Sequence, residues 1–564
     1  MVAMRYPLTF RALLSGLLLG VVFSFIAIYL YLKVGIIALG GVFLIGYLIL
    51  SVTGGYDAKE NAMILTIVGA CMLTAMGFID PIIALIVYKD YVTSEVIIDL
   101  PLLISLVLPG ILLGIFVLYP MHREFVELRW PMVTPMAYMV KVLEEKGSRE
   151  LRYALEGMAF SSATSISLML SGYYQIDLSG RKNREAFSFT SVFLSPLYAS
   201  LGFFISFIGY LFLMIGVAYS MFVWFFFEHA SPLISFQQHF FNPYIYSMAI
   251  PMMITTAILT LISYGKKMRR ALLSMGAESR TARFLSILSL VLLPAVSYLL
   301  LSLTGAVSLS KSSEVLGIIL VALPIVFISS IFAVRAAGET GFSSSFTLDA
   351  TLIIALFLFA PSFESILIAF AIISVFESMA ISLIRRIKFC SIIGVEPKTV
   401  LKAVLIGGLA GALFGPWIFL IIHNYQGGVG SVLWPAPMAK LLGGYILLFY
   451  LGIKNRKLPP MIKPELLVVS VVITIIIWYA LHRKGLKQLS PILIAIGMVI
   501  PPSFLWIAAV GAFIDLRLLR KFGSDPKIYG QERSKWNAML AGVMSGEGIV
   551  IFIMTLLSII PLIV

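Results

Sequence analysis

The residue best placed for chemistry is Glu547, which stands inside the last long apolar stretch of the 564-residue chain. A carboxylate in hydrocarbon is costly, so acids in such places usually line a cavity, a substrate path or a proton relay. A buried carboxyl group here can take up and release a proton, which predicts a proton-coupling role for Glu547. The alternative is a carboxyl group that only hydrogen-bonds a neighbouring helix. Gly546 lets a helix or a ligand approach the backbone closely, so we place it on the substrate path.

A second acid, Glu60, opens another apolar stretch together with Asn61, and Asp80-Pro81 interrupts the same stretch. An acid followed by a proline breaks a helix and frees carbonyl groups beside a carboxylate, which suits a proton or a cation. We therefore predict that Glu60 is a second proton-coupling residue and that Asn61 lies on the substrate path. The alternative for Glu60 is a place at a helix start, where the helix dipole favours an acid.

Polar residues fill the segment 335–345 between two apolar stretches, and a short apolar run ending at Pro361 follows. Half-spans bounded by Gly and Pro indicate discontinuous helices, whose free N–H and carbonyl groups can bind substrate. Arg335 is suited to hold a substrate carboxylate through a bidentate pair. The alternative is an ordinary cytoplasmic loop with a charge pair. The predicted substrate path consists of Asn61, Arg335, Glu339, Asp349, Thr351, Glu377 and Gly546.

The elements that must position these residues are membrane-spanning helices. Hydrophobic residues make up 60% of the chain and charged residues 12%, with a mean hydropathy of +1.02. A soluble fold cannot bury so much apolar surface, whereas about 20 apolar residues cross a bilayer as one helix. The apolar stretches, among them 61–88 and 314–334, predict about 16 crossings, some of them broken. The predicted fold class is an all-α, polytopic integral membrane protein.

Basic residues gather in the loops 122–152, 266–283, 385–402 and 517–535, whereas the loops 89–99, 228–242 and 423–434 are nearly free of Lys and Arg. This asymmetry predicts a multi-pass protein of the cell membrane with a cytoplasmic N-terminus. The net charge of +14 is then a topology signal, and we expect no nucleic-acid partner. Basic clusters at 181–184 and 483–487 do not fit, so the span count is wrong there or those segments are re-entrant.

Several kinds of site are missing from the sequence. The two cysteines, Cys71 and Cys390, lie far apart in apolar contexts and no Cys/His ligand spacing exists, so we expect no metal centre, disulfide or cofactor. No GxxxxGK[ST] motif is present, so the chain does not itself bind ATP through a P-loop. Energy for any transport must come from an ion or substrate gradient, or from a partner subunit.

The chain contains an internal repeat. Ser195-Pro196, Gly202 and Gly216 recur 295 residues later as Ser490-Pro491, Gly497 and Gly511. Trp130-Pro131 with the Pro-Met-Ala that follows is echoed by Trp434-Pro435 with a second Pro-Met-Ala. The alternative is chance among Gly- and Pro-rich segments. We predict two related transmembrane halves, 1–284 and 285–564, a plan typical of secondary transporters with a substrate site between the halves.

Motifs in a characteristic order cover nearly the whole chain: Leu8-Thr9-Phe10-Arg11-Ala12-Leu13, Glu60-Asn61, Ala350-Thr351-Leu352-Ile353, Trp434-Pro435-Ala436-Pro437, Leu489-Ser490-Pro491, Pro501-Pro502-Ser503 and Gly546-Glu547. Together they resemble the oligopeptide transporter family, which includes the yellow stripe-like metal-chelate transporters. The resemblance implies a secondary transporter, generally proton-coupled, for small peptides, peptide derivatives or metal chelates. It also implies about 16 helices that arose by duplication. The family's Pro-Glu-Gly-Thr is here Pro131-Met132-Val133-Thr134, without the acid, which leaves substrate and coupling ion open.

Two other classes of function remain open at this point. One is an integral-membrane enzyme acting on a lipid-linked substrate, which would need clustered acids with metal-ligand spacing; Glu144-Glu145 come nearest. The other is a passive channel without a coupling acid. The expected partners are a small peptide or metal chelate, protons and membrane lipid, and the sequence leaves a homo-oligomer open.

Overall fold

The computed structural model is built almost entirely from helices. It describes residues 7–34, 55–93, 96–144, 148–177, 189, 191–230, 236–274, 277–341, 358, 361–425, 428–431, 433–455, 457, 459–486 and 489–563. Two short strands, β1 (Gln175–Asp177) and β2 (Ser191–Phe193), pair antiparallel. Among the described residues, 12 helical segments are long and apolar enough to cross a membrane. The all-α, polytopic fold class is confirmed, whereas the predicted number of about 16 spans is not.

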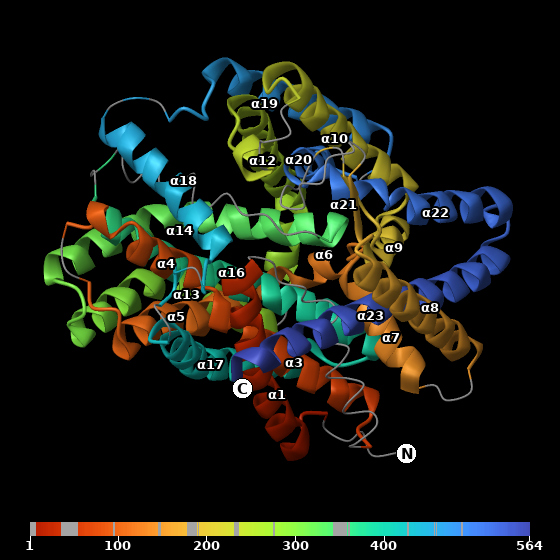
Figure 1. Ribbon diagram of the computed structural model, residues 1–564, viewed down its shortest axis with the longest axis horizontal. Helices are drawn as coiled ribbons and strands as arrows, with labels where there is room; N and C mark the ends of the chain where they lie inside the picture. Colours follow the sequence, from red (N-terminus) through yellow and green to blue (C-terminus); the bar gives the residue numbers. More distant parts are fainter. Residues whose placement is uncertain are drawn as a thin grey trace.

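The order of the described helices along the chain can be followed in Figure 1. The earlier ones are α1 (Phe10–Val34), α3 (Ala58–Met76), α4 (Ile79–Val87), α5 (Leu100–Val117), α6 (His122–Val126), α7 (Val133–Glu144), α8 (Arg149–Ser171), α9 (Pro196–Ile205), α10 (Phe207–Phe227), α11 (Phe236–Phe240) and α12 (Pro243–Ser274). The later ones are α13 (Ala277–Thr304), α14 (Leu309–Thr340), α16 (Phe363–Ile393), α17 (Pro397–His423), α18 (Pro437–Lys454), α19 (Pro464–Arg483), α20 (Ile492–Val499), α21 (Pro502–Trp506), α22 (Ala509–Phe522) and α23 (Pro526–Ile563). Two 3-10 turns, η1 (Lys89–Tyr91) and η2 (Tyr119–Met121), lie between them.

Breaks divide three of the apolar stretches into shorter helices. α3 ends at Met76 and α4 begins at Ile79, so the interruption expected around Asp80-Pro81 is present. Ser206, whose φ of 82° is unusual for a residue with a side chain, separates α9 from α10. Pro501 separates α20 from α21. The short helices α9 and α20 begin at the proline of the repeated Ser-Pro motif and directly after it, respectively, so their starts are nearly equivalent in the repeat.

One segment differs from its prediction. Arg335 and the residues after it were expected to follow the span 314–334 as a polar loop or half-helix, but residues 335–340 are the last turns of the continuous helix α14. The helix ends at Gly341, whose φ is 85°. The helix continues because its polar side chains find partners inside the protein: Arg335 pairs with Glu339 one turn away, and other helices supply further partners.

Most of the extensive helix contacts join the early part of the chain to the late part, and they occur in reciprocal pairs. α3 packs against α17 and α5 against α16; α8 packs against α23 and α12 against α19; α9 packs against α22 and α10 against α20. In the first two contacts, for example, α16 lies about 300 residues after α3, and α17 lies about 300 residues after α5. The second contact of each pair therefore repeats the first with the early and late helices exchanged, at the spacing of the sequence repeat. Each of these contacts therefore joins a helix of one predicted half to a helix of the other.

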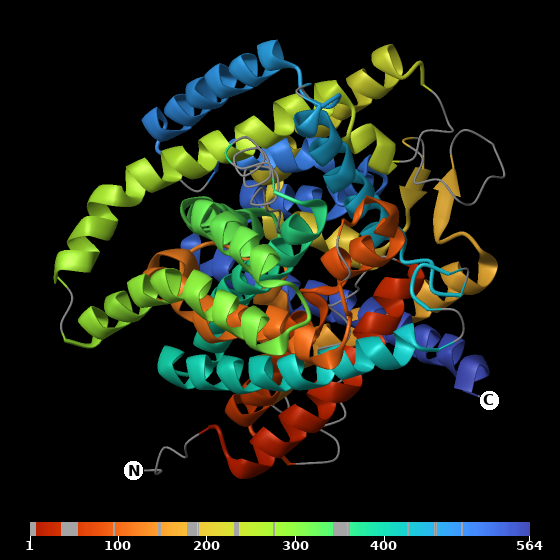
Figure 2. The same cartoon turned by 90° about the vertical axis from the view of Figure 1, so that its left-hand side faces the viewer.

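These contacts gather most of the described helices into two groups, which we call bodies (Figure 1). Body A comprises α1, α3, α4, α5, α13, α14, α16 and α17; body B comprises α8, α9, α10, α12, α19, α20, α22 and α23. α7 contacts α16 of body A and α23 of body B. α18 contacts α4 of body A, and its Tyr445 meets the hydroxyl group of Tyr246 in α12 of body B. In Figure 2, α12 and α13 extend together to one side of the molecule.

The two connecting helices α7 and α18 are entered through the same backbone arrangement. Trp130 precedes Pro131 with a φ of 52°, and Ala436 precedes Pro437 with a φ of 44°. The N–H of Trp130 donates to the carbonyl of Gly338 at 2.7 Å, and the N–H of Ala436 donates to the carbonyl of Leu32 at 2.8 Å. Both donors and both acceptors are 306 residues apart. In backbone structure, the position in the second copy of the repeat that is equivalent to Trp130 is therefore Ala436, and not Trp434 as the sequence motif indicated.

Candidate functional site

Glu547 lies on α23, is fully buried, and binds the start of α9. Its carboxylate accepts hydrogen bonds from the Ser195 hydroxyl at 2.7 Å, from the backbone N–H of Leu197 at 2.5 Å, and from the Tyr174 hydroxyl. The first N–H groups of a helix have no partner within it and carry partial positive charge, so they favour an acid there. Every helix in this contact belongs to body B, so Glu547 ties α23 to α9 within that body.

Tyr174, in the turn after α8, donates to this carboxylate from outside the spanning helices. Burial raises the pKa of the Tyr174 phenol, and the negative charge of Glu547 adds to the rise. The phenol therefore stays protonated over the physiological pH range and remains a donor. Gly546, beside Glu547, lies against α8: a Cβ atom there would collide with the carbonyl of Met158, and the Ser162 hydroxyl donates to the carbonyl of Gly546 at 3.2 Å. The structure thus places Gly546 in a close helix crossing.

Arg335 and Glu339 form a buried ion pair in the last turns of α14. The Nε of Arg335 donates to Glu339 at 2.5 Å, and the two side chains are both 3% exposed. A second guanidinium nitrogen donates to the Thr260 hydroxyl of α12 at 2.9 Å, and the guanidinium carbon lies 5.2 Å from the centre of the Trp478 ring of α19. The other Glu339 oxygen accepts from the Ser490 hydroxyl at 2.5 Å. The pair therefore belongs to body A, while Thr260, Trp478 and Ser490 belong to helices or helix starts of body B.

This cluster is the place where charge, burial and a junction between bodies coincide. A guanidinium and a carboxylate within one helix turn present a cation and an anion to the same neighbours. Those are the groups that bind the two charged ends of a zwitterion. Both charges are already paired in this structure, so a ligand must replace existing partners rather than fill unsatisfied ones.

Ser195 and Ser490 occupy equivalent positions in the repeat, and each donates to a buried acid from another helix. Ser195 binds Glu547 of α23, and Ser490 binds Glu339 of α14. Sequence reasoning picked out both serines as repeat markers without seeing their acid partners. Thr260 and Trp478 were missed, because only the packing of α12 and α19 beside α14 brings them to Arg335.

Glu60 and Glu364 form a second equivalent pair, in body A. Glu60 is buried in the first turn of α3, where it forms a capping box with Asp57 and an ion pair with Arg11 of α1. Glu364 is buried in the first turn of α16 and forms an ion pair with Lys311 of α14 at 3.1 Å. The geometry of Glu60 is that of the helix-start alternative, and its part in proton coupling remains a prediction.

The remaining predicted path residues are distributed through body A. Asn61 is buried on α3, and its amide nitrogen donates to the carbonyl of Tyr56 at 3.4 Å. Glu377 is buried on α16 and accepts from the Ser329 hydroxyl of α14 at 2.7 Å. The hydrogen bonds of these two side chains thus lie within body A. Asp349 and Thr351 lie outside the described residues.

A buried polar network at the end of α10 was not anticipated from the sequence. The ring of His239 meets the Ser220 hydroxyl at 2.9 Å through Nε2 and the Glu228 carboxylate at 2.6 Å through Nδ1, and Asn242 donates to the same carboxylate at 2.7 Å. Ser220 and His239 have no exposed surface. The network links α10, α11 and α12 within body B.

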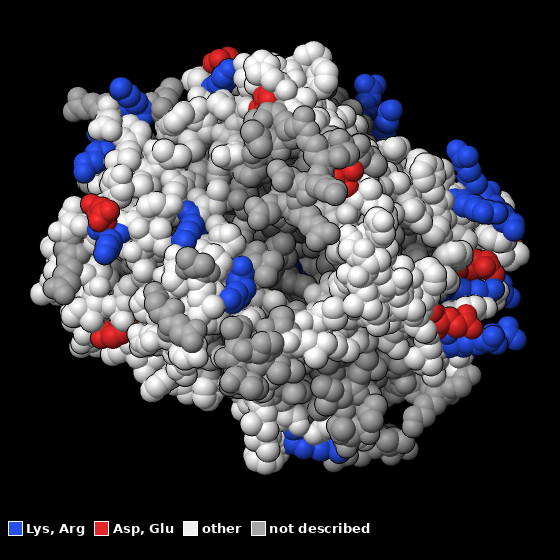
Figure 3. All heavy atoms as spheres, viewed as in Figure 1, with Lys and Arg blue, Asp and Glu red and all other residues white. Residues whose placement is uncertain are grey.

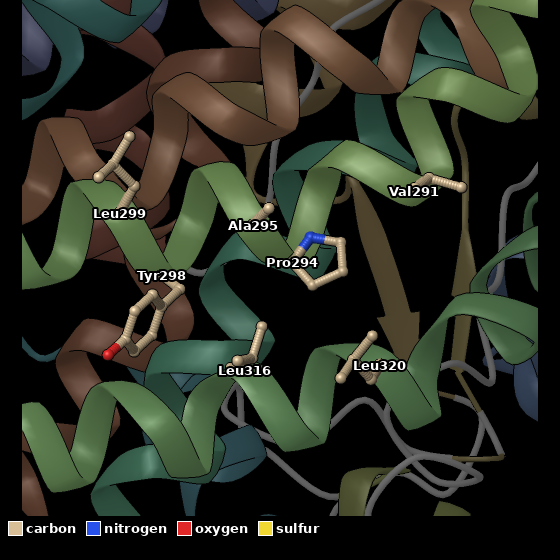
Figure 4. Close-up of a pocket in the computed structure, with 7 residues that line it drawn as sticks. All are labelled: Val291, Pro294, Ala295, Tyr298, Leu299, Leu316 and Leu320. Carbon is tan, nitrogen blue, oxygen red and sulfur yellow. The ribbon is translucent and has the colours of Figure 1, made fainter.

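Two further features bear on where a polar ligand can bind. An open groove of about 490 Å³ between α13 and α14 has an almost entirely apolar lining (Figure 4). Such a wall suits hydrocarbon better than a peptide. The face in Figure 3 is hollowed near its centre, and its Lys, Arg, Asp and Glu side chains lie mainly toward the margins. Across the described part of the chain, no group of three or more His, Cys, Asp or Glu side chains is arranged to hold a metal ion.

Comparison with known proteins covers almost the whole chain. The family model described as "OPT oligopeptide transporter protein" matches residues 7–558. A search of curated proteins finds no match. The matched region includes both bodies, the Arg335–Glu339 pair and Glu547.

Proposed function

The chain belongs to the oligopeptide transporter family, and from that membership we propose that it is a secondary active transporter that couples uptake of its substrate to proton flow. Membership makes it a multi-pass membrane transporter of oligopeptide-type substrates. The finer proposal is symport of protons with small oligopeptides, peptide derivatives or metal chelates across the cell membrane, with the N-terminus in the cytoplasm. The observation that carries it is the buried Arg335–Glu339 pair, which faces body B from the end of α14.

A peptide is a zwitterion, and the pair offers a partner for each of its ends. The guanidinium of Arg335 suits a carboxylate through two parallel hydrogen bonds, and the Glu339 carboxylate suits an ammonium group. In this structure the two residues neutralise each other, which keeps the charges stable while no ligand is bound. A peptide that inserts between them exchanges one buried pair for two, so the cost of burying its charged ends is largely offset.

Proton coupling requires an acid whose protonation changes during the cycle. We propose Glu547 and Glu60 for this role, as buried acids in transmembrane helices. Protonation of either would weaken the hydrogen bonds that it accepts and so alter how its helix is held. A pH difference of about one unit supplies about 1.4 kcal/mol per proton, enough for about a tenfold accumulation of a substrate.

Reconstitution of the purified protein into liposomes tests this function. Labelled di- to pentapeptides and iron chelates are offered outside, with the outside more acidic than the lumen. A proton-coupled symporter accumulates a substrate above the outside concentration and stops when a protonophore collapses the gradient. Equilibration without accumulation would instead identify a passive channel, and a chemically changed substrate without transport would identify a membrane enzyme.

A further inference from the structure

We infer that the substrate site lies between body A and body B, with Arg335 and Glu339 on one wall and Thr260, Trp478 and Ser490 on the other, and that these bodies, not the sequence halves, move relative to each other. The inference rests on the proposed transport function for its substrate, a zwitterionic peptide. The part of the inference that concerns the relative motion of the two bodies depends only on how the helices pack. Thr260, Trp478 and Ser490 become the residues that shape specificity from the body B side.

Within body B, helices from the two sequence halves meet backbone to backbone. A Cβ atom at Gly157 of α8 would collide with the carbonyl of Met539 in α23, and one at Gly542 of α23 would collide with the carbonyl of Ala154 in α8. The same holds where Gly511 of α22 crosses α9. Close crossings of this kind pack tightly and leave no room for one helix to slide past the other. Rocking of residues 1–284 against 285–564 would have to break all of them.

Body A is held together in the same manner. A Cβ atom at Gly411 of α17 would meet the carbonyl of Cys71 in α3, and one at Gly114 of α5 would meet the carbonyl of Phe376 in α16. These crossings again join the early part of the chain to the late part. Each body is therefore a unit assembled from both sequence halves, which the sequence boundary at residue 284 cannot separate.

Around Arg335 and Glu339 the contacts between the bodies are of a different kind, because side chains make them where α14 of body A lies against α12 and α20 of body B. The N–H groups of Arg335 reach Thr260, its guanidinium faces the Trp478 ring, and Glu339 accepts from Ser490. Phe23 of α1 also meets Phe552 of α23 edge to face, with ring centres 5.5 Å apart. Side chains can change rotamer and partner without unfolding a helix, so this interface can open while the backbone crossings stay closed.

The course of the chain agrees with this division. In the early part it passes from body A to body B through α7, and in the late part through α18, and both helices contact both bodies. Each is entered at a residue with positive φ before a proline, Trp130 or Ala436, whose N–H is bonded to a helix end of body A. Two of the crossings between the bodies are thus equivalent and anchored in the same way, and a third leads from α12 of body B to α13 of body A.

Four spin-labelled pairs distinguish moving bodies from moving halves. The labels are placed at exposed residues in a background lacking Cys71 and Cys390: Leu18→Cys on α1 and Leu320→Cys on α14 for body A, Phe160→Cys on α8 and Phe513→Cys on α22 for body B. Leu18–Leu320 and Phe160–Phe513 lie within a body but in different halves. Leu18–Phe160 and Leu320–Phe513 lie within a half but in different bodies. Double electron–electron resonance in nanodiscs gives the distance distributions at acidic and neutral pH, with and without trialanine.

The inference predicts narrow, unchanged distances for the two within-body pairs and broadened or shifted distances for the two between-body pairs. Distance shifts confined to the two within-body pairs, whose labels lie in different sequence halves, would overturn the inference and would show that the halves rock against each other. Four narrow, invariant distributions would also contradict it. Uptake by the same protein in liposomes is measured separately, so a protein whose bodies move but which accumulates no peptide would contradict the proposed function and leave the two moving bodies standing.

The binding part of the inference is tested on the body B wall. Ser490→Ala and Thr260→Val remove a hydroxyl from Glu339 and from Arg335, respectively, and we expect each to change KM for labelled dipeptides several-fold or more. Ser470→Ala is the matched control, because the Ser470 hydroxyl donates to the backbone carbonyl of Met248 within body B. A KM unchanged in both test variants, or changed equally in the control, would overturn the placement of the site.

Discussion

Gly202 and Gly497 make the same contact from opposite sides of the repeat. Gly202 of α9 lies against the carbonyl of Ala508 at the start of α22, and Gly497 of α20 lies against the carbonyl of Leu213 in α10. The glycines are 295 residues apart, and so are the two carbonyl residues. One crossing is therefore converted into the other by exchanging the two copies of the repeat, which is the relation expected of a duplicated transporter.

Replacing Gly497 with alanine is expected to lower the thermal unfolding midpoint of the detergent-solubilised protein, because the new methyl group collides with a backbone carbonyl that has no room to move. A cost of about 1–3 kcal/mol is typical of overpacking. Gly530→Ala in α23 is the matched control: its Cβ meets nothing within 4 Å, so helix propensity alone should raise stability slightly. Equal shifts for the two variants would show that the crossing at Gly497 is not tight.

Removing one partner of the Arg335–Glu339 pair should be far more damaging than breaking an exposed pair. Arg335→Gln leaves Glu339 buried without its cation, and the expected loss is about 3–5 kcal/mol. Arg152→Gln breaks the Arg152–Glu156 pair, whose side chains are 81% and 52% exposed, and should change stability by under about 1 kcal/mol. The double variant Arg335→Leu/Glu339→Leu should be more stable than Arg335→Leu alone or Glu339→Leu alone, because it leaves no unpaired buried charge. Thermal unfolding followed by tryptophan fluorescence compares all of them, and similar midpoints for Arg335→Gln and Arg152→Gln would contradict the burial of the pair.

Ala436 is held at a φ of 44°, where a side chain is strained. Ala436→Gly should relieve about 1–2 kcal/mol of strain, partly offset by the extra freedom of glycine in the unfolded chain. We therefore expect an unchanged or slightly higher unfolding midpoint. Ala439→Gly, in the first turn of α18, is the control and should lower the midpoint, because it removes a fully buried methyl group from a helix. A large loss at Ala436 would show that its backbone is not left-handed.

Tyr174 should give the protein an alkaline limit of stability. Burial raises the pKa of its phenol, so the folded state keeps the proton that the unfolded chain releases above about pH 10. The stabilisation is complete below that pH and declines as the pH rises through it. Tyr174→Phe cannot ionise, so its unfolding midpoint should fall less steeply between about pH 9 and pH 11. Parallel curves for the two proteins would contradict a buried phenol at this position.

The sequence could predict the helical membrane fold because hydrocarbon leaves few alternatives: apolar stretches of spanning length become helices, and Asp80-Pro81 marks a break that the structure contains. It could not predict that Arg335 to Thr340 continue α14. A polar segment between apolar stretches has the same composition whether it is a solvated loop or a buried helix end. The difference lies in Thr260 and Ser490, which are distant in the sequence and adjacent only after folding.

The sequence could predict the charged residues of the candidate site, but it could not predict which residues contact them. Glu547, Arg335 and Glu339 were identifiable because a charge among apolar residues needs a reason. Which of these charged residues lie together was not identifiable, because it depends on how helices of the early and late parts of the chain pack against each other. The structure consequently separates Glu547, inside body B, from Arg335 and Glu339 at the junction between the bodies.

Proton-driven uptake by the purified protein decides whether the chain is a proton-coupled symporter. Liposomes containing the unmodified protein, Glu547→Gln, or Glu156→Gln are given labelled peptide with the outside more acidic, and accumulation is followed with and without a protonophore. The unmodified protein and the Glu156→Gln control, altered at an exposed side chain, should accumulate peptide only while the proton gradient persists. Glu547→Gln should insert normally yet show uptake that no longer depends on pH. Undiminished proton-driven accumulation by Glu547→Gln would exclude its coupling role, and absence of accumulation by the unmodified protein under every substrate tested would contradict proton-coupled symport itself.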